Sequence, residues 1–320
     1  MEFPNLPRGL IVDLITPLRN DGAIDGRGLG RLLDRVSPYA QALLLASPHI
    51  GEGKNLSSQH RSELLEKTLL VLRQRPIPIF MWSSRDTEEA TRQTLFEMRE
   101  VLKKRDYGST VYWVDSPLYY HSNRGLPAYY HDICSDVREP FILHNDPEFI
   151  KDISRPFKRS NMRTAILKEL LAIENIMGLL FSGSLDRAGN YQKACHGRKD
   201  FRIYDGDETA FLEHPSMSGV ASVGANLAPK AWREVTQSSI MTAGDRKNYP
   251  DYLQQLWEVG IYLRNLKDIY GTMPVVIIKE VLSDMGIIET PTCTEESQDV
   301  EESKRRIKEL MTHYGDYPGN

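Results

Sequence analysis

Eight short apolar runs recur through most of the chain, and each is followed by a longer stretch of mixed polarity. Near-continuous apolar runs are typical of parallel strands that are buried on both faces. The stretches between them include 58–72, in which leucines recur at helical spacing, and 87–102, for which Asp86 is the predicted N-cap. The predicted strands are residues 10–15, 42–46, 77–81, 110–114, 140–144, 176–181, 201–204 and 219–223.

Alternation of strands and helices predicts a parallel sheet, either closed or doubly wound, and eight units favour the closed form. We therefore predict a (β/α)8 TIM barrel over residues 1–247, close to the roughly 250 residues that such barrels use. Residues 248–320 are predicted to form a C-terminal helical extension that packs on the barrel as one structural unit. Its predicted elements are helices at 252–269, 275–285 and 303–313 and a polar loop at 290–300.

The charge and the cysteines narrow the range of partners and compartments. Lysine and arginine number 40 against 44 aspartates and glutamates, so the chain lacks the basic excess of a nucleic-acid-binding protein. No apolar run approaches the roughly 20 residues that span a bilayer, and the N-terminus has no signal-peptide pattern. Cys134, Cys195 and Cys293 lie far apart, without metal-ligand spacing. We expect a cytoplasmic protein with no nucleic-acid or membrane partner.

Seven short motifs follow one another along the chain. They are ITPL with DGAID at 15–25, SPHIGEGKNLS at 47–57, SPLYY at 116–120, ILHNDP at 142–147, NIMGLLFSG at 175–183, DGD at 205–207 and GVASVGAN at 219–226. Their order resembles that of the dihydrodipicolinate synthase and N-acetylneuraminate lyase family, from about Leu10 to Pro229. The resemblance implies a TIM barrel followed by C-terminal helices. It also implies a homo-oligomer, either a dimer or a tetramer, that binds a small molecule of the keto-acid type.

The family's chemistry depends on a lysine in the sixth strand that forms a Schiff base with an α-keto acid, usually pyruvate. A protonated imine is an electron sink, and a desolvated lysine can attack a carbonyl near neutral pH. The matching position in this chain is Leu180, and its neighbours Leu179 and Phe181 do not supply an amine either. None of the predicted strands contains a lysine, and Lys54 is the nearest loop candidate. Ordinary imine chemistry, and any cofactor, are therefore not expected.

Two further residues are predicted to be catalytic by the resemblance. His144 stands where the family has a proton-relaying tyrosine, and imidazole can do acid–base work. Tyr119 matches the second tyrosine of the family's tyrosine pair, with Tyr120 as the competing register. His49 and Ile50 replace the two threonines that hold the substrate carboxylate, so this anchor is altered.

The pocket predicted from these matches lies at the C-terminal ends of the strands, where barrel active sites are found. Asp13 belongs to it because an unpaired carboxylate within an apolar run is costly unless it faces the barrel mouth or has a partner. The other residues predicted to line the pocket are His49, Ile50, Leu180 and Ala221. His49, Asp115, His144, Asp146, Asp205 and Asp207 all fall at predicted strand ends and would form a dense polar cluster.

No metal site is predicted, but the histidines leave an alternative open. His49 and His144, with Asp13 or Asp115, could hold a divalent metal ion that replaces the imine as electron sink. The function predicted from the resemblance is that of a lyase or aldolase acting on keto-acid-type molecules by imine-free chemistry. The alternatives are a catalytically inactive homologue that binds a small ligand or regulates a partner, and a scaffold or interaction protein that uses only the outer surface of the barrel.

Overall fold

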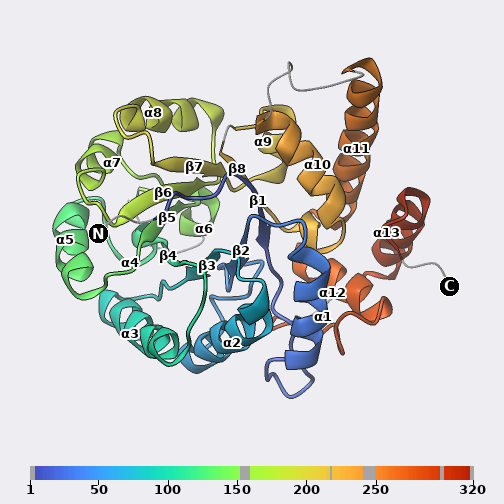
Figure 1. Ribbon diagram of the computed structural model, residues 1–320, viewed down its shortest axis with the longest axis horizontal. Helices are drawn as coiled ribbons and strands as arrows, with labels where there is room; N and C mark the ends of the chain where they lie inside the picture. Colours follow the sequence, from blue (N-terminus) through green and yellow to red (C-terminus); the bar gives the residue numbers. More distant parts are fainter. Residues whose placement is uncertain (1–3, 152–158, 217, 241–248, 296–298, 318–320) are drawn as a thin grey trace.

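The computed structural model describes residues 4–151, 159–216, 218–240, 249–295 and 299–317. Eight parallel strands form a closed barrel in sequence order, and β1 pairs with β8 to close it. The predicted (β/α)8 fold is therefore confirmed (Figure 1). The strands are β1 (Gly9–Asp13), β2 (Ala42–Leu45), β3 (Ile79–Trp82), β4 (Val111–Asp115), β5 (Phe141–Asn145), β6 (Ile176–Phe181), β7 (Arg202–Asp205) and β8 (Gly219–Ser222).

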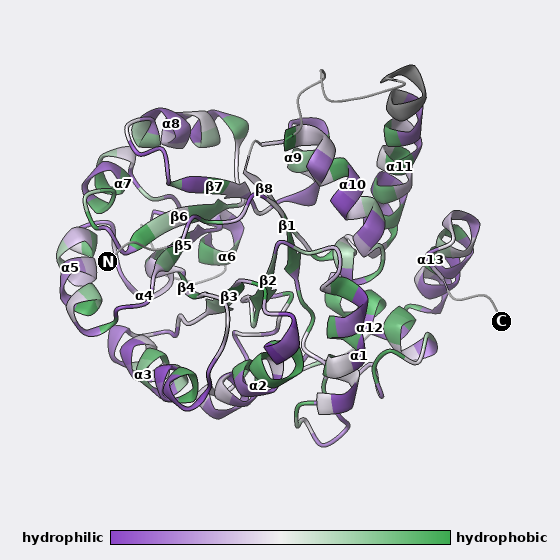
Figure 2. Ribbon diagram, viewed as in Figure 1, coloured by the Kyte–Doolittle hydropathy of each residue, from purple (hydrophilic) through white to green (hydrophobic). Residues whose placement is uncertain are grey.

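Helices surround the strands on the outside of the barrel (Figure 1). In Figure 2, β1, β2 and β6 are mostly hydrophobic, as expected when both faces of the sheet are buried, whereas β7 is hydrophilic and the helices carry residues of both kinds. The helices of this ring are α1 (Gly26–Val36), α2 (Ser58–Val71), α3 (Glu88–Lys104), α5 (Leu126–Asp136), α7 (Thr164–Leu170), α8 (Leu185–Cys195), α9 (Glu208–Glu213) and α10 (Pro229–Ile240). Two short helices, α4 (Pro117–Tyr120) and α6 (Pro147–Lys151), directly follow β4 and β5 at the C-terminal ends of these strands.

Helix α3 begins at Glu88, one residue later than predicted. Thr87, rather than Asp86, caps the helix, because its hydroxyl accepts a hydrogen bond from the backbone N–H of Ala90 at 3.1 Å. Both residues are chemically able to cap a helix. The predicted cap at Asp86 is therefore wrong by one position, which sequence alone does not resolve.

Side chains fill the barrel at the N-terminal end of the strands. The ring of Phe80 contacts those of Tyr112 and Tyr204 there, with centroid distances of 5.4 and 5.8 Å. The hydroxyls of Tyr112 and Tyr204 donate to the carbonyl oxygens of Pro4 and Pro7, so the N-terminal segment lies across this end. Among the described residues, these side chains and the N-terminal segment close this end of the interior, and barrel active sites lie at the opposite end.

The C-terminal extension consists of α11 (Tyr249–Tyr270), α12 (Pro274–Asp284) and α13 (Glu301–Tyr314). Helix α11 packs against α9, α10 and α13, and the three helices lie to one side of the barrel in Figure 1. The segment between α12 and α13 reaches loops at the C-terminal ends of the strands, since Thr290 donates to the carbonyl of Leu18 at 2.8 Å and the N–H of Thr294 donates to Glu52 at 2.6 Å. The predicted boundary at residue 247 lies outside the described residues.

Within the described ranges, no helix combines the length and the apolar character that crossing a bilayer requires.

Candidate active site

A cavity of about 200 Å³ lies at the C-terminal ends of the strands. Every strand of the barrel, or the residue just after it, contributes to its wall. Such convergence is what the fold provides, because parallel strands present their carboxyl ends at one face. One lining residue per strand, in order, is Asp13, Leu44, Trp82, Val114, His144, Leu180, Gly206 and Ala221.

The structure brings most of the predicted pocket residues to this cavity. Asp13, His49, Ile50, Leu180 and Ala221 all line it, together with the predicted catalytic residue His144.

Tyr119, the other residue predicted to be catalytic, does not line the cavity. Its ring packs against Phe149 and Trp82, with centroid distances of 5.0 and 6.3 Å, in the layer next to the cavity wall. Tyr120, the competing register, is buried and donates its hydroxyl to Asp115 at 2.7 Å. Neither tyrosine of the single-turn helix α4 therefore faces the cavity.

Asp13 is the acidic group on the β1 side of the cavity. Its Oδ1 accepts a hydrogen bond of 2.6 Å from the Ser47 hydroxyl, which itself accepts from the N–H of Gly51 at 2.8 Å. Burial raises the pKa of Asp13 from 3.8 to about 7, the Ser47 bond opposes this rise, and the carboxylate of Glu208 adds to it. Near neutral pH this carboxyl group can both accept and donate a proton.

His144 stands across the barrel from Asp13, because β5 is four strands from β1 in either direction. Its Nδ1 lies 2.7 Å from the Ser116 hydroxyl, and the Nε1–H of Trp82 donates to that hydroxyl at 2.8 Å. An indole nitrogen only donates, so Ser116 accepts from Trp82 and has its own proton to give to Nδ1. In this arrangement the imidazole carries its proton on Nε2, which has no hydrogen-bond partner among the described residues.

The imidazole of His144 is held in its neutral form. Burial lowers its pKa to about 4, an effect that the charge of Asp146 opposes and His49 reinforces. The side chain is only 7% exposed. A neutral imidazole whose N–H borders a cavity can donate a hydrogen bond to an oxygen that gains negative charge during a reaction.

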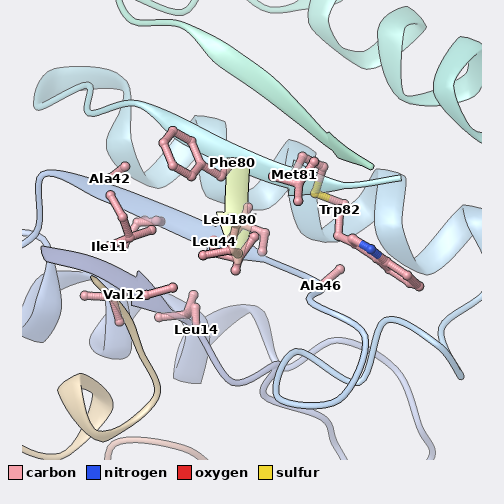
Figure 3. Close-up of a cluster of buried hydrophobic side chains, with 14 of the residues drawn as sticks. Ile11, Val12, Leu14, Ala42, Leu44, Ala46, Phe80, Met81, Trp82 and Leu180 are labelled. Atoms are coloured by element: carbon pink, nitrogen blue, oxygen red, sulfur yellow. The ribbon is translucent and has the colours of Figure 1, made fainter. Parts of the chain in front are cut away.

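Leu180, which the sequence motif predicts at the position of the family's Schiff-base lysine, lies in the β6 wall. It is 5% exposed, pairs with His144 and Tyr204 in the sheet, and lies inside the barrel near Leu44 (Figure 3). Among the described residues, no lysine or arginine lines the cavity. Lys54, the loop candidate, is exposed and outside the lining.

The loop that carries His49 and Ile50 is fixed by buried contacts. A Cβ on Gly53 would lie 1.9 Å from the carbonyl oxygen of Ala46, so only glycine fits that position. Glu52 adopts a positive φ of 54° and forms a buried ion pair with Lys279 of α12, which also donates to the Thr292 carbonyl at 2.7 Å. The extension therefore holds one wall of the cavity in place.

The predicted cluster of strand-end carboxylates does not assemble. Asp115 turns away from the cavity and accepts hydrogen bonds from Ser84, Tyr120 and Tyr130 at 2.6, 2.7 and 2.6 Å. Asp205 accepts from the N–H of Ser216, and Asp207 caps α9 through the N–H of Ala210. Only His49, His144 and Asp146 of that predicted set reach the cavity.

The described residues do not bring the proposed metal ligands together in the arrangement of a metal site. In the part of the chain that the structure describes, no three histidine, cysteine, aspartate or glutamate side chains lie close enough together to hold a metal ion. Asp115, one of the two proposed carboxylate ligands, faces the tyrosines of α4 and α5.

Several lining residues were not predicted, among them Ser47, Trp82, Val114 and Ser182. The alternation of side chains along each strand could have identified Trp82 and Val114, which pair with each other in the sheet and share the inward face with Phe80 and Tyr112. Ser47 and Ser182 lie in loops beyond the strands, where no periodic pattern applies.

Comparison with known proteins identifies one family. The model of the Dihydrodipicolinate synthetase family matches residues 6–313. The 4-hydroxy-tetrahydrodipicolinate synthase of Alcanivorax borkumensis is 25% identical over 312 residues, covering 96% of this chain and 98% of that protein.

Two solved structures share the fold. The first monomeric dihydrodipicolinate synthase variant superposes with a TM-score of 0.78 at 20% identity, covering 96% of this chain and 97% of that one. The dihydrodipicolinate synthase of Aquifex aeolicus superposes with a TM-score of 0.76 at 21% identity, covering 98% and 100%.

Proposed function

The chain belongs to the dihydrodipicolinate synthetase family, and from this premise we propose that it is a lyase that acts on a small carbonyl compound without forming an imine. The observation that carries the proposal is the pair of proton-transfer groups on opposite sides of the cavity. Asp13 and His144 flank a wall in which Leu180 replaces the amine that imine chemistry needs.

Asp13 is proposed as the base. Its pKa of about 7 means that a substantial share of the molecules carry the carboxylate near neutral pH. The carboxylate removes a proton from the carbon next to the substrate carbonyl. The electron pair of that C–H bond forms a C=C bond to the carbonyl carbon, and the carbonyl oxygen becomes negatively charged.

His144 is proposed to stabilise that oxygen. The chain of hydrogen bonds from Trp82 through Ser116 to Nδ1 supports a proton on Nε2. A neutral imidazole donor of this kind stabilises an enolate oxygen without itself carrying a charge. Preorganised donors contribute more in a cavity from which water is largely excluded than they do in water.

The lyase step completes the proton balance on a β-hydroxy carbonyl compound. The enolate electrons re-form the carbonyl and expel the β-hydroxyl group, which takes the proton from Asp13 and leaves as water. The products are an α,β-unsaturated carbonyl compound and water, and Asp13 returns to its carboxylate form. No co-reactant is required.

The test is proton exchange in D2O, followed by NMR, with a panel of small ketones and β-hydroxy aldehydes. The wild-type protein should label the carbon next to the carbonyl and consume the β-hydroxy compounds. Asp13→Asn and His144→Phe should each reduce labelling by roughly 10²- to 10⁴-fold. The matched control is Asp34→Asn, which alters an exposed aspartate on α1. Labelling that survives in both cavity variants would contradict the assignment.

A ligand-binding protein without turnover is the second candidate, and the apolar Leu180 and Ile50 in the cavity wall favour it. It predicts a ligand-dependent rise in melting temperature with no labelling of any ligand in the panel. The same samples therefore distinguish the two functions.

We also propose that the protein is a cytoplasmic homo-oligomer, a dimer or a tetramer. Trp257 and Ile261 support association because they lie one turn apart on α11 and are 74% and 42% exposed. The three free cysteines among the described residues are compatible with a reducing compartment. Light scattering of the full chain, compared with Trp257→Ser, tests the oligomer, and a monomeric wild-type protein would contradict it.

A further inference from the structure

The cavity wall carries acidic side chains, whereas the carboxylate of a keto acid is best held by cations or charged hydrogen-bond donors. Asp13 and Asp146 both line the cavity, and no lysine or arginine of the described ranges does. The buried guanidinium of Arg61 lies 4.7 Å from the Trp82 ring centroid and does not line the cavity. Its two terminal nitrogens donate to the carbonyls of Ser84 and Gly53, and its Nε has no hydrogen-bond partner among the described residues.

The polar atoms of the wall are mostly acceptors. Asp13 uses Oδ1 for the Ser47 bond, and Asp146 uses Oδ1 to accept from the N–H groups of Glu148 and Phe149 at 2.9 and 3.2 Å. The second oxygen of each carboxylate has no hydrogen-bond partner among the described residues. Within the same part of the chain, the single buried donor that lines the cavity without a partner is His144 Nε2, on a side chain that is 7% exposed.

We propose that this cavity binds carbonyl compounds that carry hydroxyl or amino groups and no carboxylate, and that Asp13 and Asp146 exclude carboxylate-bearing ligands. One donor, His144 Nε2, suits one carbonyl oxygen, and two open carboxylate oxygens suit ligand O–H or N–H groups. A ligand carboxylate would meet the charge of Asp146, and also that of Asp13 in the share of molecules in which Asp13 is ionised, without a cation to offset them. This inference deepens the proposed function, because it assumes only that the same cavity is the ligand site.

The predicted loss of the threonine pair that would hold a substrate carboxylate agrees with this charge pattern. His49 and Ile50 stand at the rim, where Ile50 offers no donor and the His49 ring packs edge-on against Phe149 at 5.2 Å. Ser182 is the remaining hydroxyl of the wall apart from Ser47. A hydroxyl or amino group of a ligand can bond to either carboxylate or to Ser182, whereas a carboxylate gains only weak neutral donors.

Three probes of nearly the same size isolate the effect of charge. Pyruvate carries a carboxylate, pyruvamide replaces it with a neutral amide, and aminoacetone carries an ammonium group. Calorimetric titration of the full-length protein should give the weakest binding for pyruvate, roughly tenfold or more below pyruvamide. Aminoacetone should bind at least as tightly as pyruvamide.

Asp146→Asn is the matched variant, because an asparagine side-chain oxygen can still accept from the backbone N–H groups of α6. It should reduce the preference for pyruvamide over pyruvate several-fold without changing the melting temperature greatly. Asp207→Asn, which alters the capping aspartate of α9 outside the cavity, serves as the control and should leave the preference unchanged.

The outcomes separate this inference from the proposed function. Pyruvate binding equal to or tighter than pyruvamide overturns the inference, as does a failure of both pyruvamide and aminoacetone to bind. If the predicted binding order holds but no probe exchanges its protons in D2O, the charge preference stands and the proposed lyase chemistry is wrong. If proton exchange is fastest with pyruvate, the proposed chemistry stands and the charge preference is wrong.

Discussion

Replacing Asp13 with asparagine should stabilise the protein, and more so at high pH. Asparagine has the shape and neutral charge of the protonated carboxyl group, and its oxygen can still accept from Ser47. The pKa of Asp13 is raised on folding, so its bound proton favours the folded state fully below the unfolded value of 3.8. That contribution is lost as the pH rises through about 7.

The magnitude follows from the two pKa values. Between about pH 5 and about pH 8 the wild-type protein should lose about 3 kcal/mol relative to Asp13→Asn. Because Asp13 is half-buried at an open mouth, solvent screening reduces this to about 1–2 kcal/mol. Urea unfolding of both proteins at the two pH values measures the difference, with Asp34→Asn as control.

A gain that does not grow with pH would refute the reasoning about Asp13 desolvation. A loss of stability at both pH values would show that the Ser47 bond, rather than burial of the charge, dominates at this site. The expected gain in stability of Asp13→Asn accompanies a loss of substrate proton exchange, because an active-site group that is needed for the reaction can destabilise the folded protein.

The other predictions concern the supports of the cavity. Glu52→Gln should lower the free energy of unfolding by about 3–5 kcal/mol, because it leaves the Lys279 ammonium buried without an anion, and the double variant with Lys279→Met should lower it less. Urea unfolding measures both losses, and equal losses would contradict the role of the ion pair. Ser116→Ala should lower the free energy of unfolding by about 1–3 kcal/mol, because Trp82 Nε1 loses its hydrogen-bond acceptor, and should slow the exchange of substrate protons in D2O. An unchanged exchange rate would argue against Ser116 fixing the tautomer of His144. Leu180→Lys should not produce dihydrodipicolinate synthase activity in a coupled assay, because the cavity wall still holds Asp13 and Asp146 and lacks a cation that could bind the substrate carboxylate. Any turnover in this assay would contradict that explanation.

The barrel could be predicted from the sequence because its signals are local and repeated. The β6 segment illustrates this, since its predicted bounds coincide with Ile176–Phe181 of the structure. The inward position of Leu180 followed from the same motif. Strand ends and the cap at Thr87 could not be fixed, since a shift of one residue leaves the apolar pattern nearly unchanged.

The directions of side chains at the strand ends and in α4 were only partly predicted. Asp115 and His144 both sit near the ends of their strands, yet only His144 faces the cavity. Alternation decides between them, because Val114 faces inward and Asp115 therefore faces the helices. The direction of Tyr119 depends on the geometry of a single helical turn, for which the sequence carries no periodic signal.

The most direct test of the imine-free assignment is mass spectrometry of the full-length protein after incubation with pyruvate and borohydride. Borohydride reduces any imine to a stable amine, so a Schiff base would leave a permanent adduct on its lysine. Because Leu180 provides no amine and no lysine of the described ranges lines the cavity, we predict that the mass of the protein stays unchanged. A stoichiometric adduct on any lysine, Lys54 included, would contradict the account.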